Sequence, residues 1–181
     1  MPIARKLFGL LAAPLRHCRS GLELIAPTRI RLLPSRIRVA MLGFMWRTAR
    51  PADDEAIVAL CQALYIEDPA ADPVPVESIQ RTLDFLREQP GRGLALVLEC
   101  AGSISGYALL IAFWSNELGG ETCAVDELYV VPERRGRGWA VRLLRELAEP
   151  DHPWAFGAVA LTVETTADNV EARRLYARAG F

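Results

Sequence analysis

A short segment of the chain, residues 126–140, combines glycines and charged side chains that could bind an anion. It reads Asp-Glu-Leu-Tyr-Val-Val-Pro-Glu-Arg-Arg-Gly-Arg-Gly-Trp-Ala, so an apolar strand runs into a turn containing Gly136 and Gly138, and the turn opens a helix. Backbone N–H groups at a helix start lack intrahelical acceptors, and the helix dipole adds partial positive charge there. Glycines let a phosphate approach the backbone, and Arg135 and Arg137 add positive charge. The segment therefore predicts an anion site suited to phosphate.

Two common phosphate-binding motifs do not fit this segment. A P-loop requires Gly-x-x-x-x-Gly-Lys-Ser/Thr, and the chain has no lysine after Lys6. The dinucleotide fingerprint requires a third small residue where Val141 stands. Gly136-x-Gly138 alone is weak evidence, because a loop with an exposed arginine cluster has the same pattern.

Three blocks of the sequence together resemble the GNAT N-acetyltransferases. Residues 135–140 match the pyrophosphate loop of that family, Arg/Gln-x-x-Gly-x-Gly/Ala. Residues 169–181 give a second block, N-x-x-A-x-x-x-Y-x-x-x-G-F, at the distance expected in the family. Residues 47–53, R-x-A-x-x-A-D, are similar to its first strand and helix. The resemblance covers about residues 45–181.

The resemblance implies acetyl-CoA as co-substrate and requires no metal. In this family the strand before the loop and the next parallel strand splay apart, and the pantetheine arm enters the gap like an added strand. Backbone groups of the strand would hold the pantetheine amides and the thioester carbonyl. Backbone N–H groups of the loop would hold the pyrophosphate. A helix N-cap role suits Asn169 equally well. The implied cofactor-binding residues are Leu128, Tyr129, Val130, Arg135, Gly136, Arg137, Gly138, Trp139, Ala140 and Asn169.

The implied reaction is direct attack of a primary amine, on a small molecule or peptide, on acetyl-CoA. Such an amine is protonated at neutral pH, so a base must remove a proton. Asp126 and Glu127 are the candidates, and strand alternation lets only one of them face the cleft. Glu127 is favoured over Asp126, and an edge or surface carboxylate is the alternative role for Glu127. Tyr176 stands at the family's position for protonating the leaving thiolate, with a packed aromatic as the alternative. Trp114 is predicted as a substrate wall or as a buried core aromatic.

The C-terminal end of the sequence motivates an alternative function. The family continues after Gly-Phe into a last strand that completes its sheet, whereas this sequence ends at Phe181. We expect that strand to be missing, or to be supplied from elsewhere, such as by the partner in a homodimer. Without it, the sheet keeps an unpaired edge. A catalytically silent acyl-CoA-binding or interaction module is therefore the alternative to an enzyme.

Hydrophobic periodicity predicts the elements that position these residues. The expected order, β-α-α-β-β-β-α-β-α, indicates a mixed α/β fold with three α-β-α layers. With the resemblance, this is the acyl-CoA N-acyltransferase fold, a central mixed sheet with its final strand missing. We expect strands at 46–50, 94–100, 104–114, 123–131 and 159–163, and helices opening at 51 and spanning 76–89, 137–149 and 169–179.

Composition predicts one globular domain and an unusual N-terminus. The 181 residues are 51% hydrophobic and 24% charged with net charge −1, which argues against disorder and a nucleic-acid partner. This neutrality is a cancellation, because residues 1–44 carry +7 and residues 45–181 carry −8. We predict an N-acetyltransferase domain at 45–181 and a basic extension at 1–44 that is disordered or reflects a mis-set start. Targeting, or a nucleic-acid or membrane tether, is the alternative.

The cysteines and the apolar segments point to a reducing compartment. The four cysteines are widely spaced with no Cys-x-x-Cys pair, so zinc and redox motifs have no support. The N-terminal apolar run, residues 7–15, is too short to span a bilayer. We therefore expect a cytoplasmic protein without a membrane or metal partner. The acceptor amine is not specified, although the negative domain would favour a cationic amine.

Overall fold

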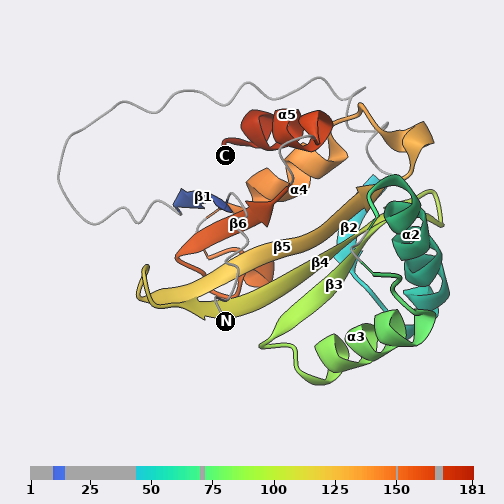
Figure 1. Cartoon of the computed structure of the whole chain (residues 1–181), viewed down its shortest axis with the longest axis horizontal. Helices are drawn as coiled ribbons and strands as arrows, with labels where there is room; N and C mark the ends of the chain where they lie inside the picture. Colours follow the sequence, from blue (N-terminus) through green and yellow to red (C-terminus); the bar gives the residue numbers. More distant parts are fainter. Residues whose placement is uncertain (1–9, 15–43, 70–71, 150, 166–168) are drawn as a thin grey trace, which may run out of the picture.

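A computed structural model describes residues 10–14, 44–69, 72–149, 151–165 and 169–181. One six-stranded mixed sheet lies between two layers of helices, α2 and α3 on one face and α4 and α5 on the other (Figure 1). The predicted three-layer α/β fold is therefore confirmed. The strands are β1 Leu10–Pro14, β2 Phe44–Thr48, β3 Gly93–Cys100, β4 Ser103–Ser115, β5 Gly120–Val130 and β6 Ala160–Glu164. The helices are α2 Asp54–Glu67, α3 Val76–Glu88, α4 Trp139–Leu147 and α5 Val170–Ala179, with short 3-10 turns at Pro51–Asp53, Pro132–Arg134 and Pro153–Ala155.

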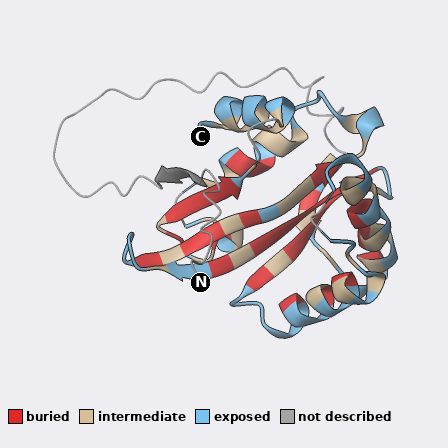
Figure 2. Cartoon of the chain, in the orientation of Figure 1, coloured by how far each residue is buried: buried red, intermediate tan, exposed pale blue. Residues whose placement is uncertain are grey.

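Each helix layer covers its own hydrophobic core. The first core packs Ile57 and Leu60 of α2 and Leu83 of α3 against the sheet, with Tyr107 of β4 fully buried among them. The second core packs the leucines of α4 against the opposite face. Figure 2 shows the resulting burial along the central strands, where buried residues dominate. None of the helices in the described parts of the chain is long and apolar enough to cross a membrane.

The sheet forks where the parallel pairing of β5 with β6 ends. The strand order is β1-β6-β5-β4-β3-β2. Strands β5 and β6 pair in parallel from Thr122↔Ala160 to Val125↔Val163, and β5 then continues through residues 126–130. That stretch stays paired with β4 on its other edge. Within the described residues no strand pairs with its β6-side edge, so a row of backbone groups is left available there.

A register shift in the β4–β5 pairing lies at the fork. Leu109 pairs with Glu127 and Leu110 with Val125, so Asp126 is the extra residue of a β-bulge. A bulge interrupts the alternation of side chains between the two faces. The expectation that only one of the two neighbouring carboxylates faces the cleft depended on that alternation, and both residues line the cleft.

The outer edge of β6 is paired, contrary to the expected unpaired edge. Strand β1 runs antiparallel to β6, from Leu10↔Glu164 to Pro14↔Ala160. Within the predicted N-terminal extension, 1–44, the structure describes residues 10–14 and Phe44, so the prediction for the extension as a whole stays a prediction. The predicted domain start at residue 45 falls inside β2, whose Phe44 pairs with Cys100.

The block at residues 47–53 forms a buried ion pair between β2 and the turn before α2. Asp53 is 8% exposed. It accepts two bonds from the Arg47 guanidinium, at 2.7 and 3.0 Å, and one from the Arg50 backbone N–H at 2.7 Å. The bond from Arg47 is the largest cause that holds the pKa of Asp53 below its usual range. This contact fixes the start of α2 against the sheet.

Replacing Asp53 by Asn is expected to lower the free energy of unfolding by about 2 kcal/mol at pH 7, because charge-assisted bonds are lost. The pKa of Asp53 is lower in the folded state, so its contribution is present above about pH 4 and is lost as the pH falls further. Urea unfolding at pH 7 and pH 3 measures both effects. The control is Asp84→Asn, which removes an ion pair of an exposed carboxylate and should cost under about 0.5 kcal/mol. Equal losses for the two variants would contradict this account.

Candidate functional site

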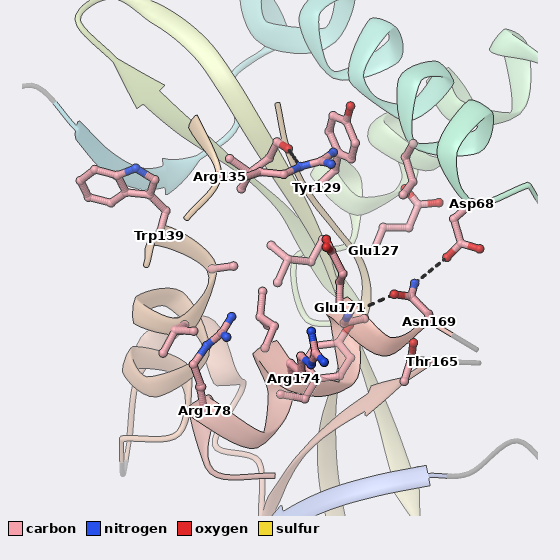
Figure 3. Close-up of a pocket in the computed structure, with 18 of the residues that line it drawn as sticks. Asp68, Glu127, Tyr129, Arg135, Trp139, Thr165, Asn169, Glu171, Arg174 and Arg178 are labelled. Carbon is pink, nitrogen blue, oxygen red and sulfur yellow. Dashed lines mark hydrogen bonds between the residues drawn. The ribbon is translucent and has the colours of Figure 1, made fainter. Parts of the chain in front are cut away.

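A cleft of about 1220 Å³ opens where β5 runs beyond the end of β6 (Figure 3). Its floor is residues 126–130 of β5. Its walls are the C-terminal end of α2, the turn and first residues of α4, and α5. The structure brings together here every site residue predicted from the sequence except Trp114: Asp126, Glu127, Leu128, Tyr129, Val130, Arg135, Gly136, Arg137, Gly138, Trp139, Ala140, Asn169 and Tyr176.

The start of α4 presents free backbone donors to this cleft. Gly136 and Gly138 have φ values of 72° and 81°, in the left-handed region that glycine adopts readily. Gly138 is the N-cap, and the first N–H to bond back to it is that of Arg142, at 2.9 Å. The N–H groups of residues 139–141 therefore have no intrahelical acceptor. Together with the helix dipole they form an anion site.

Arg135 ties this loop to the rest of the cleft. Its Nε donates to the Val130 carbonyl at 2.8 Å, and its guanidinium bonds both oxygens of Glu67 at 2.9 and 2.7 Å. The guanidinium also lies over the Tyr129 ring, 5.1 Å from the centroid. Glu67 in turn accepts a bond from the Tyr129 hydroxyl at 2.7 Å. Arg135 thus positions the loop, and its charge is already paired with Glu67.

Other arginines carry positive charge on the cleft walls. Arg137 lies in the loop, and Arg174 and Arg178 extend from α5 into the cleft (Figure 3). Among the described residues, Arg137 and Arg174 have no ion-pair partner. Sequence reasoning missed the two α5 arginines; their i, i+4 spacing puts both on one face of the helix and is the signal that could have grouped them.

The aromatic side chain of Trp139 anchors the loop to the far edge of the sheet. Its ring stacks on Phe44 of β2, with centroids 4.9 Å apart. Its carbonyl accepts a bond from the Trp46 indole N–H at 3.0 Å. The Arg134 guanidinium lies over the Phe44 ring, 5.5 Å from its centroid. The bulky residue at this position therefore braces the start of α4 against β2.

Three donors converge on the carboxylate of Glu127 at the fork. The hydroxyl of Tyr65 donates to Oε1, and that of Tyr107 donates to Oε2 at 2.6 Å. The thiol of Cys61 is 3.7 Å from Oε2. Cys61 is a small buried residue of the core, with 1% of its surface exposed. The sequence did not reveal the two tyrosines, which lie far from Glu127 in the chain.

Asp126 lies on the bulge beside a third carboxylate. Glu164 follows Val163, the last β6 residue paired with β5, so these two side chains flank the point where the strands part. Loss of hydration in the cleft, followed by the charges of Glu127 and Glu164, raises the pKa of the Asp126 carboxyl. Asp126 is exposed, and no hydrogen bond to its side chain occurs among the described residues.

Asn169 and Tyr176 form the α5 side of the cleft. The Asn169 Oδ1 accepts the Ala172 N–H at 3.0 Å, so the N-cap role is confirmed and a cofactor role stays a prediction. Its Nδ2 donates to Asp68 at 3.3 Å and links α5 to the end of α2. Burial, followed by the negative charge of Asp68, raises the pKa of the Tyr176 phenol. Tyr176 therefore retains its proton at neutral pH.

Trp114 lies away from this cleft. It pairs with Glu121 at the hairpin end of β4, and 66% of its surface is exposed. The fork is at the other end of that strand pair. Trp114 is thus not a buried core aromatic, and the structure does not bring it to the other site residues.

Comparison with known proteins agrees with this geometry. The sequence model of the Acetyltransferase (GNAT) family matches residues 57–181. Similar solved structures include Integron Cassette Protein HFX_CASS3 from the mobile metagenome of Cole Harbour Salt Marsh, with 29% identity, TM-score 0.63 and coverage of 75% of this chain and 82% of that one. The yncA structure from Salmonella typhimurium, with its cofactor acetyl-CoA, has 24% identity, TM-score 0.60 and coverage of 77% and 79%.

A third similar structure is glucosamine-6-phosphate N-acetyltransferase from Arabidopsis thaliana, with 17% identity, TM-score 0.58 and coverage of 76% of this chain and 90% of that one. At this identity the likeness shows the fold alone. No curated protein matches the chain. The family match covers more than half of the chain and includes every residue that lines the cleft. The chain therefore belongs to the GNAT acetyltransferase family.

Proposed function

We propose that this protein transfers the acetyl group of acetyl-CoA to a primary amine of a small molecule or peptide by direct attack. Family membership supports acetyl transfer in general. The observation that carries the finer proposal is the fork, where an unpaired strand edge, an anion-binding helix start and a carboxylate meet in one cleft.

The cleft fits the chemistry of acetyl-CoA, which is present in the similar structures from Salmonella typhimurium and Clostridium acetobutylicum. The free edge at residues 128–130 offers backbone donors and acceptors to the pantetheine amides. The N–H groups of residues 136–140 would hold the pyrophosphate, and Arg137, Arg174 and Arg178 would balance the phosphate charges. When bound, acetyl-CoA supplies an activated thioester.

Glu127 is the base that we assign to the incoming ammonium. Its carboxylate lines the cleft and is fixed by donors from two other elements. A fixed orientation favours proton transfer, because the geometry of the donor and acceptor is set before the reaction. Asp126 is the second candidate, on the more exposed side of the fork. Backbone N–H groups at the fork would stabilise the negative charge that develops on the acyl oxygen.

Tyr176 is the group that we assign to protonating the departing thiolate. Tyr176→Phe should lower kcat about tenfold with little change in the KM for acetyl-CoA, since the phenol proton acts late in the reaction. The ring packs edge-to-face against Phe181, and Phe preserves this contact. Steady-state kinetics at saturating amine measures the effect. A kcat equal to that of the wild type would remove Tyr176 from the mechanism.

The proposed function is tested by incubating the full chain with acetyl-CoA and a broad panel of amines. The panel includes polyamines, amino acids, aminoglycosides, peptides and glucosamine-6-phosphate, the acceptor named for the Arabidopsis enzyme. Release of free CoA thiol well above background with at least one amine is the expected result. Thermal stabilisation by CoA with only background thiol release would instead support the silent acyl-CoA-binding module.

A further inference from the structure

The Glu127 carboxylate is held from behind the cleft floor by side chains that lie outside the cleft. Tyr65 of α2 donates to one carboxylate oxygen, and Tyr107 of β4 donates to the other at 2.6 Å. Cys61, one turn before Tyr65 on α2, lies 3.7 Å from the second oxygen. None of the three lines the cleft, and Tyr107 is fully buried.

The protonation states of these neighbours make them donors. Burial, followed by interactions that include the negative charge of Glu127, raises the pKa of the Tyr65 and Tyr107 hydroxyls. Burial likewise raises the pKa of the Cys61 thiol, to about 12. All three groups therefore keep their protons at neutral pH.

A second pair of contacts fixes α2 over β5 at the same place. Tyr65 of α2 reaches Glu127 of β5, and two residues on, Glu67 of α2 accepts a bond from Tyr129 of β5 at 2.7 Å. The two tyrosine–glutamate bonds run in opposite directions between the same two elements. Glu67 also holds Arg135 of the loop. One helical turn of α2 is thus bonded both to the carboxylate and to the anion-binding loop.

The Glu127 carboxylate can still accept a hydrogen bond from a substrate. A carboxylate can accept about four hydrogen bonds. Three donors already reach Glu127 from the α2 and β4 side, which leaves capacity on the side of the cleft that Glu127 lines. We propose that Tyr65 and Tyr107, assisted by Cys61, are positioning residues that fix the orientation of the Glu127 carboxylate and aim its remaining acceptor site at the substrate amine. This inference rests on the proposed function.

The test compares kcat with the KM for acetyl-CoA in Tyr65→Phe and Tyr107→Phe, with the best amine of the panel at saturation. Each variant loses only a hydroxyl. With one donor fewer, the Glu127 carboxylate is held less firmly toward the amine, so kcat at pH 7 should fall about tenfold. The KM for acetyl-CoA should stay within about twofold, because neither hydroxyl faces the cleft.

The matched control is Thr122→Val, which removes a buried hydroxyl from the same sheet. Thr122 donates to the Phe113 carbonyl at 2.8 Å and does not contact Glu127. It should lower the melting temperature and keep kcat within about twofold of the wild type. Tyr65 is only partly buried, so Tyr65→Phe keeps the test decisive if Tyr107→Phe does not fold.

The outcomes separate this inference from the proposed function. If the wild type acetylates an amine and the folded tyrosine variants keep its kcat, the positioning role is overturned while acetyl transfer stands. An equal loss of kcat in the tyrosine variants and in Thr122→Val also overturns it. If the wild type acetylates no amine, the proposed function fails and the positioning role fails with it.

Discussion

Glu127→Gln is expected to lower kcat by roughly 100- to 10,000-fold, the usual contribution of a positioned general base. The amide has nearly the same shape as the carboxylate. Its oxygen can accept from one tyrosine and its NH2 group can donate to the hydroxyl oxygen of the other, but it cannot take a proton from an ammonium. Binding of acetyl-CoA should be nearly unchanged, because the loop and the free β5 edge provide it. Steady-state kinetics and calorimetric binding of CoA measure the two quantities separately.

Asp126→Asn is the discriminating variant for this first prediction. Asp126 is the neighbouring carboxylate at the fork, and it has no hydrogen-bond donor among the described residues to fix its orientation. If Glu127 is the base, the loss of kcat in Asp126→Asn should be smaller by at least about tenfold. A larger loss in Asp126→Asn than in Glu127→Gln would transfer the role of base to Asp126.

Gly138→Val is expected to weaken CoA binding by roughly 10- to 100-fold, because a β-branched residue is strained by about 1–3 kcal/mol at positive φ. Gly138 has φ 81° at the N-cap of α4. An added Cβ would meet no atom within 4 Å, so the penalty comes from backbone strain alone. Relieving the strain would turn the N–H groups of residues 138–140 away from the cleft. Calorimetric titration with CoA measures the loss.

Gly157→Val is the matched control for the loop prediction. Gly157 has φ 66° and equally open surroundings, and it does not line the cleft. Its replacement should lower the free energy of unfolding by about as much as Gly138→Val does and leave the affinity for CoA unchanged. Equal loss of CoA affinity in both variants would show that the Gly138 effect is a general consequence of destabilisation.

The sequence predicted the architecture well because each element has its own local pattern. The expected second helix, 76–89, is observed at Val76–Glu88, since Ile79, Leu83 and Leu86 repeat at helical spacing and Pro90-Gly91 ends it. The loop and α4 were predicted because Gly136 and Gly138 are conformational signals as well as motif positions. The residues of the cleft were grouped correctly, since they lie in two contiguous blocks on neighbouring elements.

Long-range contacts could not be predicted in the same way. The bulge at Asp126 depends on the register between β4 and β5, which no local pattern encodes, and it placed both carboxylates on the cleft. The contacts of Tyr65 and Tyr107 with Glu127 join residues 62 and 20 positions apart. Trp114 was assigned from its position before the catalytic strand, but β4 extends away from the fork there. The pairing of β1 with β6 is equally non-local.

The most direct test of acetyl transfer at the fork is to follow labelled acetyl groups by mass spectrometry. The full chain is mixed with acetyl-CoA carrying a ¹³C-acetyl group and the best amine of the panel, and Glu127→Gln is run in parallel. The account predicts labelled amide and free CoA in equal amounts over many turnovers, at least about 100-fold less product from Glu127→Gln, and no label on the protein. Labelled protein that forms before the amide, or bound CoA without labelled product from any amine, would contradict it.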